Sequence, residues 1–147
     1  MISKILKIDW NCKLTWKKSI KNTSWCLLGC SIGDFGTIFF FQITEIAFPI
    51  LGIMTLAIIN GLITSITLET VILIRQNFKL INAIKTALGM SFISMISMEI
   101  AMNLTDFVLT GGAVLNWYII PIMLIAGFIT PLPYNYYKLK KYNISCH

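Results

Sequence analysis

The chain has 147 residues, of which 56% are hydrophobic and only 12% are charged. A soluble domain carries about a quarter charged residues, so this composition argues against a soluble enzyme, a disordered regulator and a secreted disulfide-rich domain. Twelve Lys and Arg residues against six Asp and Glu residues give a net charge of +6. In a chain with long apolar runs, this surplus is more typical of membrane orientation than of nucleic-acid binding.

Four apolar stretches are long enough to cross a membrane, since a spanning helix needs about 20 mostly apolar residues. They cover residues 24–42, 47–74, 80–104 and 113–131. The sequence therefore predicts an all-α integral membrane protein with a four-helix bundle over residues 24–131.

The two flanking segments are basic. Residues 1–23 mix six lysines with Trp and Leu, which predicts an amphipathic segment at the membrane interface. Residues 132–147 predict a basic cytoplasmic tail.

The basic residues also predict the orientation. All of them lie before the first span, around the second connection or after the last span, whereas the other two connections carry Glu45 and Asp106. Cytoplasmic segments are enriched in Lys and Arg. We therefore expect a multi-pass protein of the cell membrane with both termini in the cytoplasm.

Three acidic residues fall within the predicted spans: Asp34, Glu69 and Glu99. A carboxylate near the middle of a bilayer costs roughly 2.5–3.5 kcal/mol, and no basic residue lies at matching depth except Lys85 near one end of the third span. We expect these acids to be protonated, hydrogen-bonded to Ser, Thr or Asn, in contact with water, or bound to a cation.

The third span places methionines and acids on one stripe. At about 100° per residue, Ser91, Met98, Glu99, Met102 and Asp106 fall within about 60° of Met95. Thioether sulfur suits soft ions such as Cu(I). The alternative for the methionines is packing, because Met commonly fills irregular gaps between helices.

The first span carries cysteines at helical spacing. Cys26, Cys30 and Asp34 share one face, beside a stripe of small residues formed by Gly29, Gly33 and Gly36. Such a stripe lets a second helix approach closely. The alternative for the two cysteines is that they are small packing residues.

All four cysteines (Cys12, Cys26, Cys30 and Cys146) fall on the predicted cytoplasmic side. We therefore expect free thiols and no disulfide.

Together these residues form a candidate metal site. Its predicted ligands are Cys26, Cys30, Asp34, Glu69, Met95, Met98, Glu99 and Met102. The only histidine is His147, and no nucleotide-binding or hydrolase motif is present. No catalytic residue can be assigned, so we expect no enzymatic activity.

Three short motifs in this order resemble a family of small four-span prokaryotic membrane proteins that is defined only as a domain of unknown function. They are Gly29-Cys30-x-x-Gly33-Asp34, Met98-Glu99-x-x-Met102-Asn103 and Pro133-x-Asn135. Members commonly have His where this chain has Trp25, Glu where it has Asp34, and Asp where it has Ser91 and Met102. The resemblance implies the four-span fold but no activity, and the departures leave fewer hard ligands and more sulfur.

Two functions are expected from these features. The first is binding or handling of a soft metal, copper above all, within the bundle. The second is a non-catalytic accessory subunit of a larger membrane complex, for example a metalloenzyme. A proton-coupled transporter that uses the three acids is a third alternative. As partners we expect the lipid bilayer and either a second copy of the chain or that complex, and no nucleic acid.

Overall fold

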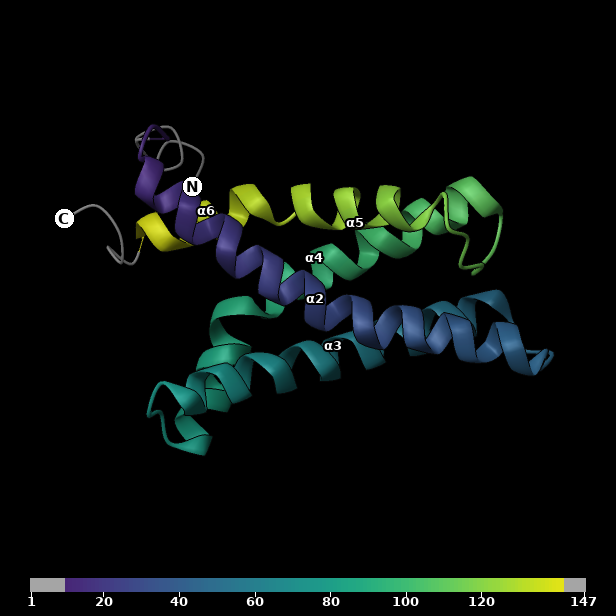
Figure 1. The fold of residues 1–147 in the computed structure, drawn as a ribbon, viewed down its shortest axis with the longest axis horizontal. Helices are drawn as coiled ribbons and strands as arrows, with labels where there is room; N and C mark the ends of the chain where they lie inside the picture. The colour runs from purple at the N-terminus through teal and green to yellow at the C-terminus, as the bar shows by residue number, and fades with distance from the viewer. Residues whose placement is uncertain (1–9, 142–147) are drawn as a thin grey trace.

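The computed structural model describes residues 10–141, apart from the side chains of residues 86 and 90, and this part of the chain is helical. Its elements are α2 (Lys13–Thr44), α3 (Ile50–Arg75), α4 (Leu80–Thr110), α5 (Ile120–Ile129) and α6 (Leu132–Lys141). Figure 1 shows α2 and α3 side by side as one antiparallel pair, with α5 running back along α4.

Helix α2 joins two segments that the sequence analysis separated. It begins at Lys13, so part of the predicted interfacial segment and the first predicted span form one helix. At 1.5 Å per residue, its 32 residues extend about 48 Å, beyond the roughly 30 Å of a hydrocarbon core. The helix ends at Glu45, whose φ of 49° is left-handed.

Small residues bring α2 and α3 together. A Cβ atom on Gly29 would lie 2.6 Å from the Cα atom of Ser65, and one on Gly33 would overlap the backbone of Asn60. Thr64 Oγ1 donates a hydrogen bond to the carbonyl oxygen of Gly29 over 2.6 Å. The predicted close approach is therefore confirmed at Gly29 and Gly33, but not at Gly36, where nothing lies within 4 Å of the added atom.

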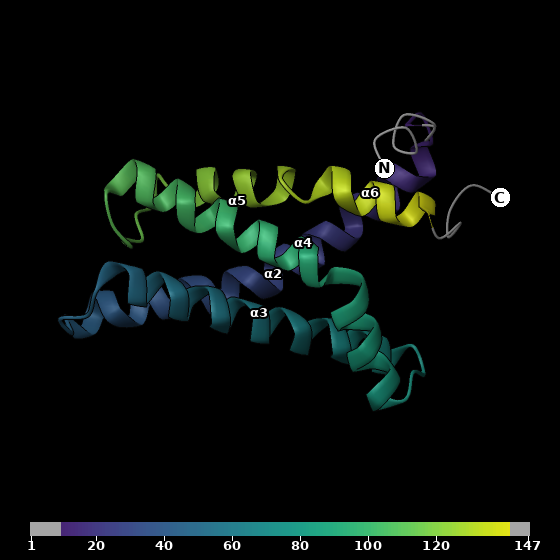
Figure 2. The same ribbon diagram turned by 180° about the vertical axis from the view of Figure 1, so that it is seen from behind.

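Helix α4 extends six residues beyond the predicted third span and changes direction along its length (Figure 2). The part from Ser91 to Thr110 is apolar enough to cross a membrane. Its C-terminal end is closed by Gly111, which has a φ of 72°.

The fourth predicted span is not one helix. Residues 113–119 lie outside the helices, and α5 holds only 10 residues, about 15 Å, so it is too short to cross a membrane alone. Proline is the physical reason. Pro121 lies in the first turn of α5, where proline favours a helix start, and Pro131 follows its end.

Helix α6 is held against the beginning of α2. Asn135 Nδ2 donates to Thr23 Oγ1 over 2.8 Å, and Ser19 Oγ donates to the carbonyl oxygen of Leu132 over 3.3 Å. The ring of Tyr136 stacks on Trp10 with centroids 5.0 Å apart. These contacts bring the two described ends of the chain to the same end of the molecule, as Figure 1 shows.

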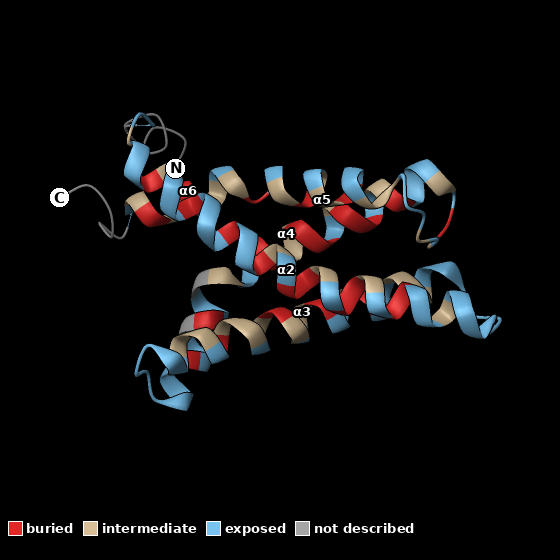
Figure 3. Ribbon diagram, viewed as in Figure 1, coloured by how far each residue is buried: buried red, intermediate tan, exposed pale blue. Residues whose placement is uncertain are grey.

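The distribution of side chains is compatible with contact between the helices and a lipid bilayer. Large apolar side chains such as Leu51, Ile81 and Val108 face outward and are more than two-thirds exposed. Buried residues lie mainly where the helices meet (Figure 3), and they include Asp34, Glu99 and Asn103. Three segments, Lys13–Thr44, Ile50–Arg75 and Ser91–Thr110, are long and apolar enough to span a membrane.

Candidate functional site

A cluster of sulfur atoms lies at the centre of the fold. Cys26 and Cys30 from α2 pack with three methionines of α4 and one of α5, and Leu27, Phe35 and Leu62 surround them. The methionines are Met95, Met98, Met102 and Met123, each fully buried. We call these six residues the sulfur cluster.

The predicted methionine stripe of α4 is one buried face. Met95, Met98, Glu99 and Met102 have no exposed surface, and Asp106 has 1%. Helical periodicity correctly placed these residues together because α4 is continuous over this stretch.

Glu99 lies beside the sulfur cluster, near Cys30 and against Gly61 of α3. Its carboxylate leaves no room for a side chain at residue 61, where an added Cβ atom would overlap Oε1. Neither carboxylate oxygen of Glu99 has a partner at hydrogen-bond geometry within the described part of the chain, and the Cys30 thiol is the donor that lies close enough to interact with it.

Asp34 lies one step further along the same interior. Its Oδ1 atom accepts a hydrogen bond from Asn103 Nδ2 over 3.0 Å, and the carboxyl group interacts electrostatically with Glu99 and Asp106. Its Oδ2 atom is buried and has no partner among the described residues. Asp34 thus adjoins Glu99 but is not part of the sulfur cluster.

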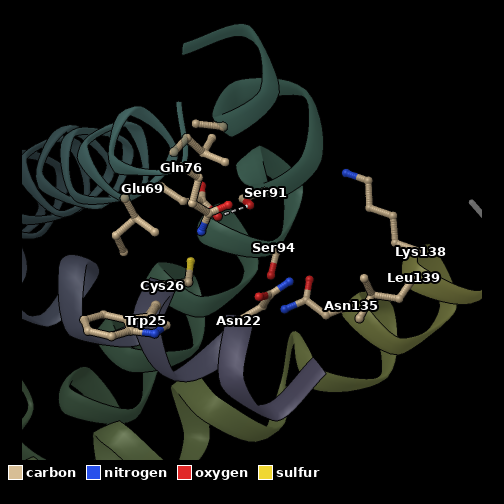
Figure 4. A pocket seen from close by; sticks show the side chains of 13 residues that line it. Asn22, Trp25, Cys26, Glu69, Gln76, Ser91, Ser94, Asn135, Lys138 and Leu139 are labelled. Atoms are coloured by element: carbon tan, nitrogen blue, oxygen red, sulfur yellow. Dashed lines mark hydrogen bonds between the residues drawn. The ribbon is translucent and has the colours of Figure 1, made fainter. Parts of the chain in front are cut away.

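Glu69 is separated from the other acids. Its Oε1 atom accepts a hydrogen bond from Ser91 Oγ over 2.6 Å, and the residue lines a cavity of about 220 Å³ between α2, α3, α4 and α6. Cys26 lines this cavity as well, and its thiol points toward the Glu69–Ser91 pair (Figure 4). Glu69 therefore shares this cavity with Cys26, but it does not join the sulfur cluster.

The cysteines differ from one another. Cys26 and Cys30 are free thiols, as predicted. Cys12 is disulfide-bonded, so the prediction of free thiols throughout is wrong there. That prediction relied on the expected compartment and took no account of which thiols the fold brings together. Cys146 lies outside the described residues.

Some residues of this interior were missed. Met123 belongs to the sulfur cluster, and its approach depends on Gly127 of α5, where an added Cβ atom would lie 2.6 Å from Met102 Cγ. Asn103 positions Asp34. Asp106, which was placed on the stripe, has a structural role, because its Oδ2 atom accepts a hydrogen bond from the backbone N–H of Val114 over 3.1 Å. The available signal for Asn103 in the sequence was the presence of an amide side chain within a predicted span.

A metal site built only from His, Cys, Asp or Glu is absent from residues 10–141. No three His, Cys, Asp or Glu side chains in this part of the chain are grouped so as to hold an ion. Any ion in this interior would therefore depend on thioether sulfur in addition to the thiols and carboxylates.

Comparison with known proteins gives one match. The model of the family described as a domain of unknown function, DUF4396, matches residues 15–143. No curated protein and no solved structure matches the chain.

Proposed function

Since the chain belongs to the DUF4396 family, whose function is unknown, we propose that its sulfur cluster binds a soft metal ion, Cu(I) first, within a membrane-spanning four-helix bundle. Helices α2, α3 and α4 supply three of the four membrane-spanning segments of this bundle. Helices α5 and α6 together form the fourth, since residues 120–141 extend about 33 Å.

The donor atoms favour a soft ion. The side chains of two cysteines and four methionines pack together in the interior, and soft sulfur ligands select Cu(I) over hard divalent ions. Packing alone would also explain buried methionines, since Met fills irregular gaps.

The observation that carries the proposal is the position of Glu99. Packing does not require a carboxylate, and a buried charge is costly unless it is paired. Both oxygens of Glu99 lack partners in the described part of the chain, next to the thiol of Cys30. A monovalent cation held by the neighbouring sulfur atoms would neutralise this carboxylate.

The cavity at Glu69 offers a route to the cluster. It is lined by Asn22, Gln76 and Lys138 as well as Cys26, so polar groups extend from one end of the bundle to the first thiol. We assign this basic end to the cytoplasm by the positive-inside rule. Cys26 would then be the first ligand that an ion meets.

Copper analysis of the purified protein tests the proposal. The protein is prepared in detergent under reducing conditions with copper and compared with M98L/M102L, which preserves most of the side-chain volume, and with E99Q. Met54→Leu is the matched control, because Met54 lies outside the sulfur cluster.

We expect near-stoichiometric copper in the wild type and M54L. In M98L/M102L and E99Q, Cu(I) affinity should fall by at least about tenfold, the scale seen when groups that support a metal site are removed. Equal stoichiometry and affinity in all four proteins would overturn the proposal.

One feature favours the second function, an accessory subunit. Asn60 is exposed on α3, in a groove between α2 and α3 that Gly36, Phe40 and Thr64 also line. The Asn60 Nδ2 atom donates a hydrogen bond to Thr37 Oγ1 of α2 over 2.8 Å, so only the rest of this side chain is open to a neighbour. An exposed polar side chain in a span favours a protein neighbour over lipid. Purification in mild detergent discriminates: a monodisperse particle of this chain alone would argue against an obligate complex.

A further inference from the structure

The cavity between α2, α3, α4 and α6 is large enough for a small molecule. Its volume is about 220 Å³, whereas one water needs roughly 10–15 Å³ on this measure. Thirteen residues line it, and Figure 4 shows their side chains. The sulfur cluster contributes only Cys26 to this lining.

One wall of the cavity has a carboxylate oxygen and a hydroxyl group without hydrogen-bond partners among the described residues. Glu69 Oε2 and Ser94 Oγ are buried and have no partner among the described residues. The whole Ser94 residue is only 1% exposed, and the other oxygen of Glu69 is already bound by Ser91. This wall therefore suits a group with several N–H donors and a positive charge.

Another wall has a cation and two amides. Lys138 Nζ donates to the carbonyl oxygen of Gly89 over 2.9 Å, which fixes the amine at the cavity. Lys138 also interacts electrostatically with Glu69 of the facing wall. The side chains of Asn22 and Asn135 lie together below Lys138 in Figure 4. This wall suits an anionic group.

Apart from Gln76, the remaining lining is mostly apolar and lies near the membrane surface. It includes Trp25, which is 44% exposed, with Ile72 and Leu139. Glu69 is six residues from the end of α3 at Arg75, a depth of about 9 Å along the helix. Trp and Lys side chains at this level are typical of the headgroup region.

We propose that this cavity binds a zwitterion that carries a primary ammonium and a phosphate, the chemistry of phosphoethanolamine. The ammonium contacts Glu69 and Ser94, and the phosphate contacts Lys138 and the two amides. Such a group can come from a phosphatidylethanolamine headgroup or from a free solute. The proposal goes beyond metal binding and does not depend on it.

The two walls predict a clear selectivity. A choline headgroup has no N–H to donate to Ser94, and a glycerol headgroup has no positive charge for Glu69. Phosphatidylethanolamine should therefore bind better than phosphatidylcholine or phosphatidylglycerol with the same acyl chains.

Native mass spectrometry of the detergent-purified full chain with these three lipids tests this. We expect about a tenfold preference for phosphatidylethanolamine, the scale of one charge-assisted hydrogen bond. Glu69→Gln and Ser94→Ala should each reduce this preference. Lys138→Met should weaken the binding of all three lipids, because each of them carries the phosphate. Glu45→Gln is the control, since Glu45 lies exposed at the opposite end of α2.

Competition with free phosphoethanolamine separates the two sources. Displacement of the lipid supports a site for the zwitterion itself, and retention supports a site for the lipid. Equal retention of the three lipids by the wild type would overturn the proposal, as would an unchanged preference in E69Q and S94A or unchanged lipid binding in K138M. Thermal unfolding identifies any variant that has lost its fold, and each of the three variants tests the site separately.

Discussion

Asn103 Nδ2 donates a hydrogen bond to Asp34 Oδ1 over 3.0 Å and so joins α4 to α2 where neither side chain meets solvent. The same nitrogen donates to the carbonyl oxygen of Glu99 over 3.1 Å. Both N–H bonds of the amide are therefore used inside the protein. This arrangement holds Asp34 next to Glu99 and explains why an amide lies in a membrane span.

Replacement of Asn103 by Ala should destabilise the protein. Interhelical hydrogen bonds in membranes contribute about 0.6 kcal/mol on average and up to about 1.7, and a buried acid left without its donor adds to the loss. We expect a decrease of about 1–2 kcal/mol in the free energy of unfolding, measured by denaturation in detergent.

The partner of this hydrogen bond can be verified by a double-mutant cycle. N103A and D34A should be coupled by about 0.5 kcal/mol or more, because residues in contact are not additive. Asn116→Ala, in an exposed position between α4 and α5, is the control. Additive effects of N103A and D34A would contradict the assigned contact.

Gly29→Ala and Gly36→Ala form a matched pair on one helix. The added methyl group at Gly29 would lie 2.6 Å from the backbone of Ser65, whereas at Gly36 it would meet nothing within 4 Å. Overpacking of this kind costs about 1–3 kcal/mol, so G29A should lower the melting temperature. G36A should leave it unchanged or raise it slightly, since Ala is the better helix former. Equal melting temperatures would show that α2 and α3 are not packed this closely.

Cys26 should react with a water-soluble thiol reagent faster than Cys30. Cys26 lines the cavity and is 5% exposed, whereas Cys30 has no exposed surface and is absent from the lining. Proteins that retain only one of these two cysteines can be compared by intact mass after timed labelling. Faster labelling of Cys30 would show that the cavity does not lead to Cys26.

Labelling in cells decides whether α5 and α6 cross the membrane. Single cysteines that replace Glu45 and Ala113 should react with an impermeant reagent from the side of the membrane opposite to cysteines that replace Gln76 and Lys141.

The same labels also determine the orientation of the protein. The disulfide at Cys12 favours an oxidising compartment at the lysine-rich end of the bundle, whereas the positive-inside rule places this end in the cytoplasm. Reaction of A113C and K141C from one side would exclude a fourth span.

The sequence was most informative where one helix is continuous. Met95, Met98, Glu99 and Met102 share a buried face, as a period of 3.6 residues requires. It was least informative at the fourth span, because an apolar average over residues 113–131 does not register where the backbone leaves the helix. Pro121 and Pro131 lie at the two ends of α5. These prolines indicate where the helix begins and ends, which the average hydropathy of the segment does not.

The sequence alone determined the apolar character of the helices and the face on which each polar residue lies, since transfer free energy and helical periodicity are local properties. The tertiary structure decided which faces meet. Glu99 lies against the sulfur cluster and Gly61, whereas Glu69 shares a cavity with Lys138. These neighbours depend on the rotation and the order of packing of the helices, and both are set by contacts between residues far apart in the chain.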